Sequence, residues 1–226
     1  MTKYLSIDCE TSGLDPTKSE LLEVGIVVFD TEESELKMTA YNSLRIVFVK
    51  EQIQGNIFAI NMNINLLNEI LTISKEFDKP GVETIIEKTS DNLTTWYVDI
   101  RGKRLLDTMF LSDYLDEDNQ AIGDLTYKLT AWLSAAKVNG KLNAAGKNFA
   151  IFDKAFLEKF SCFKKVILRK MSHKVLDIGS MYVTKEDKCL PSLDECLQRA
   201  SINEAVSHNA VDDARLTALA ALYKLQ

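Results

Sequence analysis

Apolar and polar residues alternate over the first predicted element of the chain. The apolar positions are Leu5, Ile7 and Cys9, and the polar positions are Ser6, Asp8 and Glu10. Successive side chains of a strand point to opposite faces of a sheet. The pattern therefore predicts a strand with one apolar face and one face that carries two neighbouring carboxylates.

Further strands are predicted where short apolar runs end in turn-forming residues. Residues 21–29 are almost continuously apolar, which is typical of a strand buried on both faces. Shorter runs at residues 45–49, 94–100 and 142–145 predict three more strands. The chain thus has strands from its first residues to its second half.

Apolar residues recur at helical spacing between and after these strands. Residues 57–73 predict a helix that four asparagines interrupt, with the apolar stripe Ile60, Ile64, Leu67 and Leu71. Residues 121–138 carry the clearer stripe Ile122, Leu125, Leu129, Trp132, Leu133 and Ala136. Residues 152–160 predict a third helix, and the spacing of Ser192 and Glu195 predicts a capping box that opens a fourth helix, which ends near Ala200.

The last helix has the clearest pattern in the chain. Its apolar face is predicted to be Val211, Ala214, Ala218, Leu222 and Leu225. At about 100° per residue, Asp213 lies roughly opposite Val211, so the pattern places Asp213 outside the core.

Strands that alternate with helices predict one mixed α/β domain over residues 1–226. The part from about residue 31 to residue 105 is the least regular and has a break at residues 79–81. We interpret residues 36–105 as an insertion or accessory region within the single domain.

Composition narrows the class of protein. With 46% apolar and 27% charged residues, and with no apolar run near the ~20 residues that span a bilayer, we expect a soluble protein without a membrane partner. Met1 to Tyr4 lead directly into the first strand, so we expect no secretory signal and a cytoplasmic location. The four cysteines show no Cys-x-x-Cys spacing, which makes a structural zinc site improbable and favours reduced, packed thiols.

The net charge of -6 argues against sequence-independent binding of duplex nucleic acid, which depends on many contacts from Lys and Arg to phosphate. It does not exclude nucleic acid as a substrate. Clustered carboxylates that hold divalent cations are themselves negative, and a bound cation reverses the local field.

Asp8 and Glu10 stand where the first strand ends, because turn-forming residues follow from Thr11 to Pro16. Strand ends are where sites gather in α/β proteins. The simpler interpretation is that the two carboxylates form the solvated face of an edge strand. The pair alone favours that simpler interpretation.

Two later segments add candidate residues. Asp153 opens a helix after a buried strand, a position that the helix dipole favours even without a function. His208 precedes the last helix. If it lies inside that helix it faces Asp212 at the i+4 position, whereas on a preceding loop it leaves Asp213 free to point at a separate site.

Three motifs in this order resemble those of the DEDDh 3'-5' exonucleases, which include proofreading subunits, ribonuclease T and oligoribonucleases. The first is Asp-Cys-Glu-Thr-Ser-Gly from Asp8 to Gly13, and the second is Asn-Phe-Ala-Ile-Phe-Asp-Lys-Ala-Phe-Leu from Asn148 to Leu157. The third is His-Asn-Ala-Val-Asp-Asp-Ala from His208 to Ala214, which selects Asp213 over Asp212. Residues 36–105 lie outside the resemblance.

The resemblance implies a fold and a mechanism. The fold would be ribonuclease-H-like, with a mixed five-stranded sheet flanked by helices. Two Mg²⁺ or Mn²⁺ ions would catalyse phosphodiester hydrolysis, held by the carboxylates Asp8, Glu10, Asp153 and Asp213. His208 would act as the general base that takes a proton from the attacking water.

The resemblance also implies a binding site for the terminal nucleotide. Thr11 would hydrogen-bond near the 3' end, Leu14 would wedge against a base, and Asn148 and Phe152 would line the same region. Ordinary packing is the alternative role for Leu14 and for Phe152. The expected partners are single-stranded DNA or RNA 3' ends, with a polymerase or repair protein as a possible associate.

Two other functions stay open at this point. The chain could be a catalytically inactive subunit that binds nucleic-acid ends or docks on a polymerase through residues 36–105. It could also be another nuclease of the same fold, although that gives no reason for the His-x-x-x-x-Asp element. No motif specifies the sugar, since discrimination depends on contacts to the 2' position.

Overall fold

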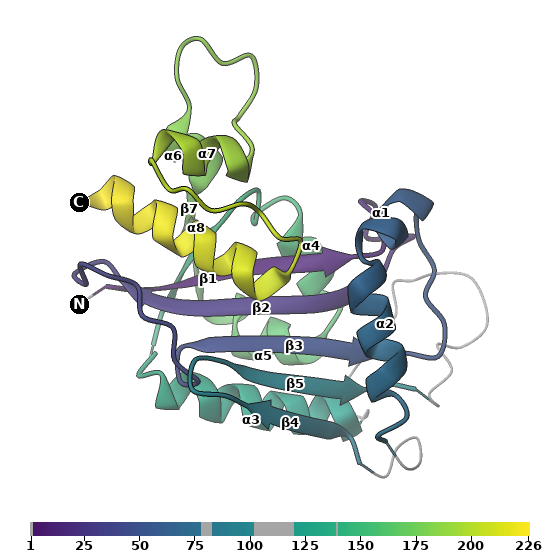
Figure 1. Ribbon diagram of the computed structural model, residues 1–226. Helices are drawn as coiled ribbons and strands as arrows, with labels where there is room; N and C mark the ends of the chain where they lie inside the picture. Colours follow the sequence, from purple (N-terminus) through teal and green to yellow (C-terminus); the bar gives the residue numbers. More distant parts are fainter. Residues whose placement is uncertain (1, 78–82, 102–119, 139) are drawn as a thin grey trace.

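The computed structural model describes residues 2–77, 83–101, 120–138 and 140–226, which form an α/β fold around one mixed sheet (Figure 1). The sheet has seven strands in the order β4-β5-β3-β2-β1-β6-β7. The strands are β1 (Lys3–Thr11), β2 (Leu21–Asp30), β3 (Ser43–Val49), β4 (Ile85–Thr89), β5 (Thr94–Asp99), β6 (Leu142–Gly146) and β7 (Met171–Asp177). The expected α/β class is confirmed, and the expected number of five strands is wrong.

Strand direction follows from the pairing. β2 is antiparallel to both β1 and β3, and β4 is antiparallel to β5, whereas the β1-β6, β6-β7 and β3-β5 pairs are parallel. β1 is therefore an interior strand of the sheet, between an antiparallel and a parallel neighbour. Its polar face cannot be the solvated face of an edge strand.

The helices form a layer on each face of the sheet (Figure 1). They are α1 (Ile57–Met62), α2 (Ile64–Ile73), α3 (Gln120–Ala135), α4 (Asp153–Leu157), α5 (Ser161–Val166), α6 (Ile178–Tyr182), α7 (Leu193–Arg199) and α8 (Ala210–Leu225), with a 3₁₀ turn at Leu168–Lys170. One core joins the sheet to α3, α4 and α5. On the other face, α8 with α6 and α7 forms a second core, and α2 forms a third.

Several predicted elements are confirmed. All ten residues of β2 are buried, as the continuous apolar run predicted. The six apolar positions predicted for α3 are all buried, and Ser192 and Glu195 form the predicted capping box at the start of α7. The four cysteines are free thiols, of which only Cys189 is exposed.

The helix predicted over residues 57–73 is wrong in two respects. It is two helices that meet at Asn63, and the buried residues of the second are Leu66, Ile70 and Ile73 rather than the predicted stripe. The Asn63 side-chain amide donates a hydrogen bond to the carbonyl of Thr11, at the end of β1. A tertiary contact thus fixes the break between α1 and α2, which periodicity alone cannot register.

The last helix also departs from its prediction. Val211, Ala214, Ala218 and Leu222 are buried as expected, but Leu225 is exposed and Asp213 is only 5% exposed. Asp213 is buried because α8 lies along β1 and β2 while α6 and α7 pack on its other side (Figure 1). The prediction that Asp213 lies outside the interior is therefore wrong.

Residues 36–105 supply β3, β4 and β5, so their described part is continuous with the main sheet. The predicted break at residues 79–81 lies outside the described residues. No helix in the described ranges is long and apolar enough to cross a lipid bilayer.

Candidate metal centre

Asp8 and Glu10 lie near the carboxyl end of β1, on the face of the sheet that α8 covers. The alternate residues of the strand, Leu5, Ile7 and Cys9, point into the core on the opposite face. The pairing of β1 with β2 becomes irregular between Glu10 and Thr11, where the strand ends. Alternation along the strand thus places both carboxylates on one face, as the sequence predicts.

His208 lies on the loop before α8 and not inside the helix. Its backbone is in the left-handed region at φ 53°, and the side chain of the next residue, Asn209, caps the helix by accepting a hydrogen bond from the N–H of Asp212. Asp213, by contrast, lies one turn into the helix and points inward. This geometry favours the second of the two alternatives that the spacing left open.

Glu10, His208 and Asp213 come together although they are distant in the sequence. Each offers one possible ligand atom, and these atoms all lie within 4.8 Å of one another. The N–H of Ser207 donates a hydrogen bond of 3.2 Å to Asp213 and thereby holds one of its oxygens in place. Two carboxylates, from β1 and α8, and an imidazole from the loop before α8 thus form one cluster.

Asp153 approaches Asp8 from the other layer of helices. It opens α4 and is only 2% exposed. Burial raises the pKa of Asp8, and the largest of the charges that raise it further is that of Asp153, followed by Glu10, Asp213 and Glu23. Asp153 therefore interacts with Asp8 in addition to its favourable place in the first turn of a helix.

The four carboxylates all resist ionisation. Burial and the charges of Glu23 and Asp213 raise the pKa of Glu10 to about 8, against the effect of a hydrogen bond from Asn63. Burial raises the pKa of Asp153 to about 7, although a hydrogen bond from the Cys9 thiol acts in the opposite direction. Burial also raises the pKa of Asp213.

Such a cluster has the properties of a divalent-cation site. Carboxylate oxygens are the ligands that Mg²⁺ and Mn²⁺ prefer, and a cation removes the mutual repulsion that raises these pKa values. The guanidinium of Arg45 is nearby but is already paired with Glu23 at 2.8 Å and with Glu69 at 2.7 Å. The ligand atoms of Glu10, His208 and Asp213 lie close enough together to fit a divalent cation, and the charges of Asp8 and Asp153 lie near them.

The loop that follows β1 presents Leu14 at the surface. Leu14 is 83% exposed, so packing in the core does not explain it. The loop is held by Ser12, whose carbonyl accepts a hydrogen bond of 2.7 Å from the N–H of Asn56 and whose hydroxyl bonds to the carbonyl of Gln54. Thr11 is buried, and its hydroxyl donates to the carbonyl of Gly13 within the same turn.

Asn148 and Phe152 precede α4 and differ in their surroundings. Asn148 is exposed with φ 61°, and its N–H donates a hydrogen bond of 2.8 Å to the Asp177 carboxylate. Phe152 is partly buried against the core, with its ring centroid 5.2 Å from that of Phe156. Phe152 thus packs against the core, whereas the Asn148 side chain is exposed to solvent.

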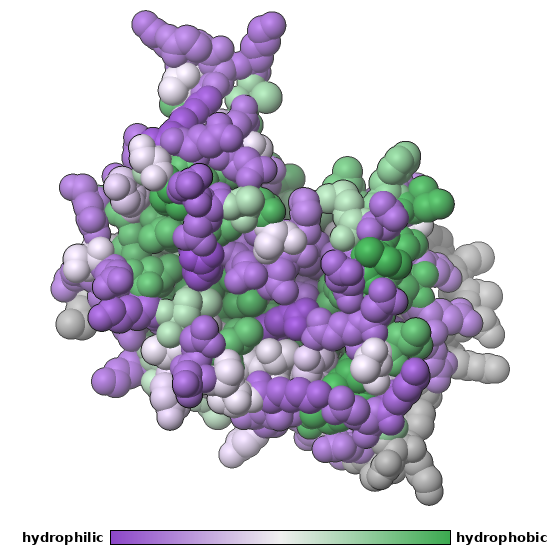
Figure 2. Space-filling view, viewed as in Figure 1, coloured by the Kyte–Doolittle hydropathy of each residue, from purple (hydrophilic) through white to green (hydrophobic). Residues whose placement is uncertain are grey.

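Exposed apolar side chains gather on α1, next to the loop that carries Leu14. Ile57, Phe58 and Met62 are each more than half exposed, and Phe58 is 78% exposed. Figure 2 shows apolar surface over α1 and α2, beside the polar centre of this face. In the sequence analysis this segment falls within residues 36–105, the region proposed there as a docking surface in the alternative binding function.

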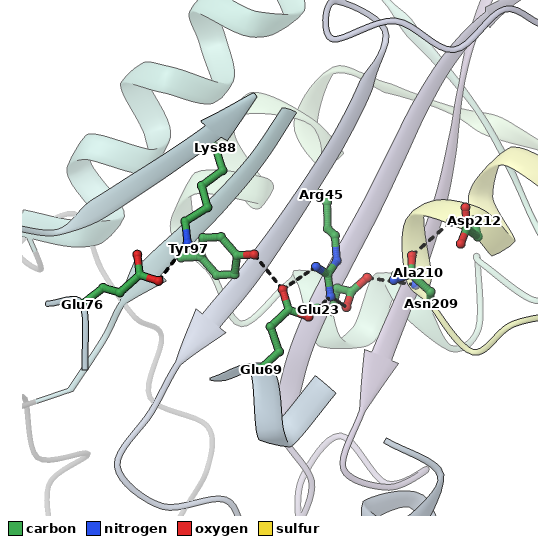
Figure 3. Close-up of polar contacts among 9 residues, drawn as sticks. All are labelled: Glu23, Arg45, Glu69, Glu76, Lys88, Tyr97, Asn209, Ala210 and Asp212. Carbon is green, nitrogen blue, oxygen red and sulfur yellow. Dashed lines mark hydrogen bonds and ion pairs between the residues drawn. The ribbon is translucent and has the colours of Figure 1, made fainter. Parts of the chain in front are cut away.

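Three residues near the cluster were missed from the sequence. Glu23 and Arg45 form a buried ion pair on β2 and β3, and Asn63 joins α1 and α2 to the end of β1 (Figure 3 shows the ion pair). The sequence does hold one indication of the role of Glu23, because it is the single acidic residue in the apolar run of residues 21–29. A charge at such a position needs a partner.

Comparison with known proteins assigns neither a family nor a function to this chain. No family model matches the chain, and no curated protein matches it with significant similarity. The interpretation of the site therefore depends on its residues and their arrangement.

Proposed function

We propose that this protein is a metal-dependent 3'-5' exonuclease of ribonuclease-H-like fold that removes nucleotides from single-stranded ends. The observation that carries the proposal is the convergence of Glu10, His208 and Asp213 within 4.8 Å, beside Asp8 and Asp153. These five residues are the ones that the three sequence motifs select. They come from β1, α4, α8 and the loop before α8, segments that are far apart in the sequence.

In the proposed site, Asp8, Glu10, Asp153 and Asp213 hold two Mg²⁺ or Mn²⁺ ions. The chemistry that such ions supply is stabilisation of the negative charge on the transferring phosphate and a lower pKa for the attacking water. The His208 imidazole takes the proton of that water as a general base. The exposed position of His208, on a loop, gives it access to solvent and to substrate.

The surroundings of the cluster support a single-stranded substrate. Leu14, Ile57 and Phe58 present apolar surface beside the acidic centre. Unstacked bases bind to such side chains through their faces, without preference for sequence. A duplex offers only stacked bases, so the exposed apolar residues favour a frayed or single-stranded end.

The proposal is tested by digestion of single-stranded DNA and RNA that carry a label at either the 3' or the 5' end. With Mg²⁺ or Mn²⁺, a 3'-labelled strand should release labelled mononucleotide at once, while a 5'-labelled strand should shorten progressively. EDTA should abolish both. Release of mononucleotide from the 5' end, or internal cleavage, would contradict the proposed polarity.

Asp213→Asn and Asp212→Asn form a matched pair of variants. They remove one carboxylate each from neighbouring positions of α8, but Asp213 is buried in the cluster and Asp212 is exposed. We expect Asp213→Asn to lose at least about 100-fold in kcat, within the range for groups that act on transition-state charge, and Asp212→Asn to retain activity. Stabilisation by Mn²⁺ with no product from any labelled strand would instead favour a subunit that only binds nucleic-acid ends.

A further inference from the structure

Glu23 is a buried carboxylate that the proposed chemistry does not use. It lies on β2, directly opposite Glu10 in the antiparallel pairing, and is only 1% exposed. An ionised carboxylate in such surroundings is costly unless it is paired and hydrogen-bonded. Its partners therefore indicate why the fold keeps it.

The first partner is Arg45 on β3. One guanidinium nitrogen of Arg45 donates to an oxygen of Glu23 at 2.8 Å and to Glu69 of α2 at 2.9 Å, and the other donates to Glu69 at 2.7 Å. The Tyr97 hydroxyl on β5 donates to Glu69 at 2.7 Å. Figure 3 shows this chain of contacts along the sheet face from β5 to β2.

The second partner is the backbone of α8. The other oxygen of Glu23 accepts a hydrogen bond of 3.0 Å from the N–H of Ala210, the first residue of that helix (Figure 3). His208 is two residues before Ala210, and Asp213 is three residues after it. The helix can approach this closely because Gly25 has no side chain, since a Cβ there would lie 2.2 Å from the Ala210 carbonyl.

We propose that Glu23, held by Arg45, is a positioning residue that fixes the start of α8 so that His208 and Asp213 meet Glu10. The role of these residues in hydrolysis rests on the proposed function. Glu23 is not among the residues whose ligand atoms come together in the cluster, and its two oxygens accept hydrogen bonds from Arg45 and from Ala210. It acts through the backbone at the start of α8, between the loop that carries His208 and the turn that carries Asp213.

Two substitutions of Glu23 separate this role from general stabilisation. Glu23→Ala removes both contacts. Glu23→Gln keeps an oxygen that can accept from Ala210, while Arg45 keeps its two bonds to Glu69. Loss of a residue that orients the groups of a metal site typically costs about 10–100-fold, so we expect such a fall in kcat for Glu23→Ala, with KM little changed and with rescue by Glu23→Gln.

Arg101→Met is the matched control. Arg101 forms a comparable ion pair with the buried Asp99 of β5 at 2.9 Å, and its remaining hydrogen bond goes to the carbonyl of Ser74. Neither partner belongs to α8. We expect this variant to lose stability and to keep its kcat. An equal fall in kcat for Arg101→Met would overturn the proposal, because general destabilisation would then explain both results.

A second measurement does not depend on activity. The chain has two histidines, His173 on β7 and His208, so a ¹H–¹³C spectrum of the labelled imidazoles contains two sets of signals. Glu23→Ala should shift or broaden the His208 signal and leave that of His173 unchanged, and Glu23→Gln should restore it. An unchanged His208 signal in Glu23→Ala would overturn the positioning role. If the wild-type protein releases no nucleotide, the proposed function fails, and these signals still decide whether Glu23 positions the loop.

Discussion

Each carboxylate of the candidate site has a pKa above its ordinary value, because burial and neighbouring charges disfavour the ionised form. The folded protein therefore holds protons that the unfolded chain releases. The difference in bound protons arises at a few side chains. Because it is a difference between the folded and unfolded states, it makes the stability of the whole fold depend on pH.

We expect the metal-free protein to lose stability as pH rises. The pKa of Glu10 goes from 4.5 to about 8 on folding and that of Asp153 from 3.8 to about 7, so the folded state binds more protons within that interval. The stability that these groups contribute is present below about pH 4 and is lost as pH rises through 7 and 8. Thermal unfolding in EDTA at several pH values measures the effect. Each kcal/mol of lost stability should lower Tm by about 2–4 °C in a protein of this size.

Asp8→Asn is the control for this pH dependence. Asp8 interacts with the charges of Asp153, Glu10 and Asp213, so its removal should raise Tm at pH 8 in EDTA and flatten the curve. Asp212→Asn, at an exposed position, should leave the curve unchanged. A metal-free protein with the same Tm at pH 5 and pH 8 would contradict the assigned origin of the raised pKa values.

At the scale of elements, the contact between β2 and α8 depends on a single missing side chain. We expect Gly25→Ala to push the start of α8 away from the sheet, because the new Cβ would lie 2.2–2.3 Å from backbone atoms of Ala210 and Val211. The predicted cost is about 1–3 kcal/mol in the free energy of unfolding, together with a loss of activity. Urea unfolding and nucleotide release measure the two effects.

Gly179→Ala tests whether this result is specific to the contact. A Cβ at Gly179 would meet the end of the Lys147 side chain at 3.1 Å and an Asp177 carboxylate oxygen at 3.2 Å. Both are side-chain atoms at distances that need a shift of only a few tenths of an ångström, whereas the contacts at Gly25 are with backbone at 2.2–2.3 Å. We expect a much smaller change in stability than for Gly25→Ala. Equal effects for the two variants would contradict the proposed steric origin.

Helix α1 is the element on which the substrate prediction rests. We expect Phe58→Ala to raise KM for a single-stranded oligonucleotide by roughly tenfold, because loss of one stacking side chain costs about 1–3 kcal/mol. Phe58 is 78% exposed, so Tm and kcat should hardly change. Tyr127→Ala, which removes an equally exposed aromatic ring from α3, is the control and should leave KM unaltered.

The elements also show where sequence patterns stop being informative. The stripe of α3 predicted five of its six buried positions and missed only Ala121, because that helix packs with one face on one core. In α8, packing on two sides buries Asp213 as well, and in α2 the break at Asn63 changes which residues face inward. Both departures arise from tertiary contacts that lie far away in the sequence.

At the scale of the whole molecule, the sequence predicted the α/β class but not the extent of the sheet. β4 was missed because only Ile85 and Ile86 of its five residues are apolar, as is usual for an edge strand with exposed side chains. The five candidate site residues could be proposed from the sequence because they stand in three short motifs of reactive side chains. Glu23 and Arg45 were not found, since their pairing depends on the register of β2 and β3.

A divalent cation should stabilise the entire fold. Ligands that bind only the folded state add about 2.7 kcal/mol at a concentration 100 times the dissociation constant. We therefore expect Mg²⁺ or Mn²⁺ to raise Tm by several degrees at pH 8, and less at pH 5, where protons compete for the carboxylates. Thermal unfolding with and without the cation measures this, and an equal rise in Asp8→Ala would contradict binding at this site.

The residues of the candidate site are far apart in the sequence, and this has a consequence for the activity of misfolded copies of the protein. Glu10 belongs to the first strand, His208 to the loop before the last helix and Asp213 to that helix. The start of the last helix is held against β2 by the hydrogen bond from the N–H of Ala210 to the Glu23 carboxylate and by the close contact at Gly25. Under the proposed function, a copy in which α8 detaches retains Asp8 and Glu10 but has no general base. A damaged molecule would then be an inert protein and not an unregulated nuclease, so the hazard posed by misfolded copies in a cell is small.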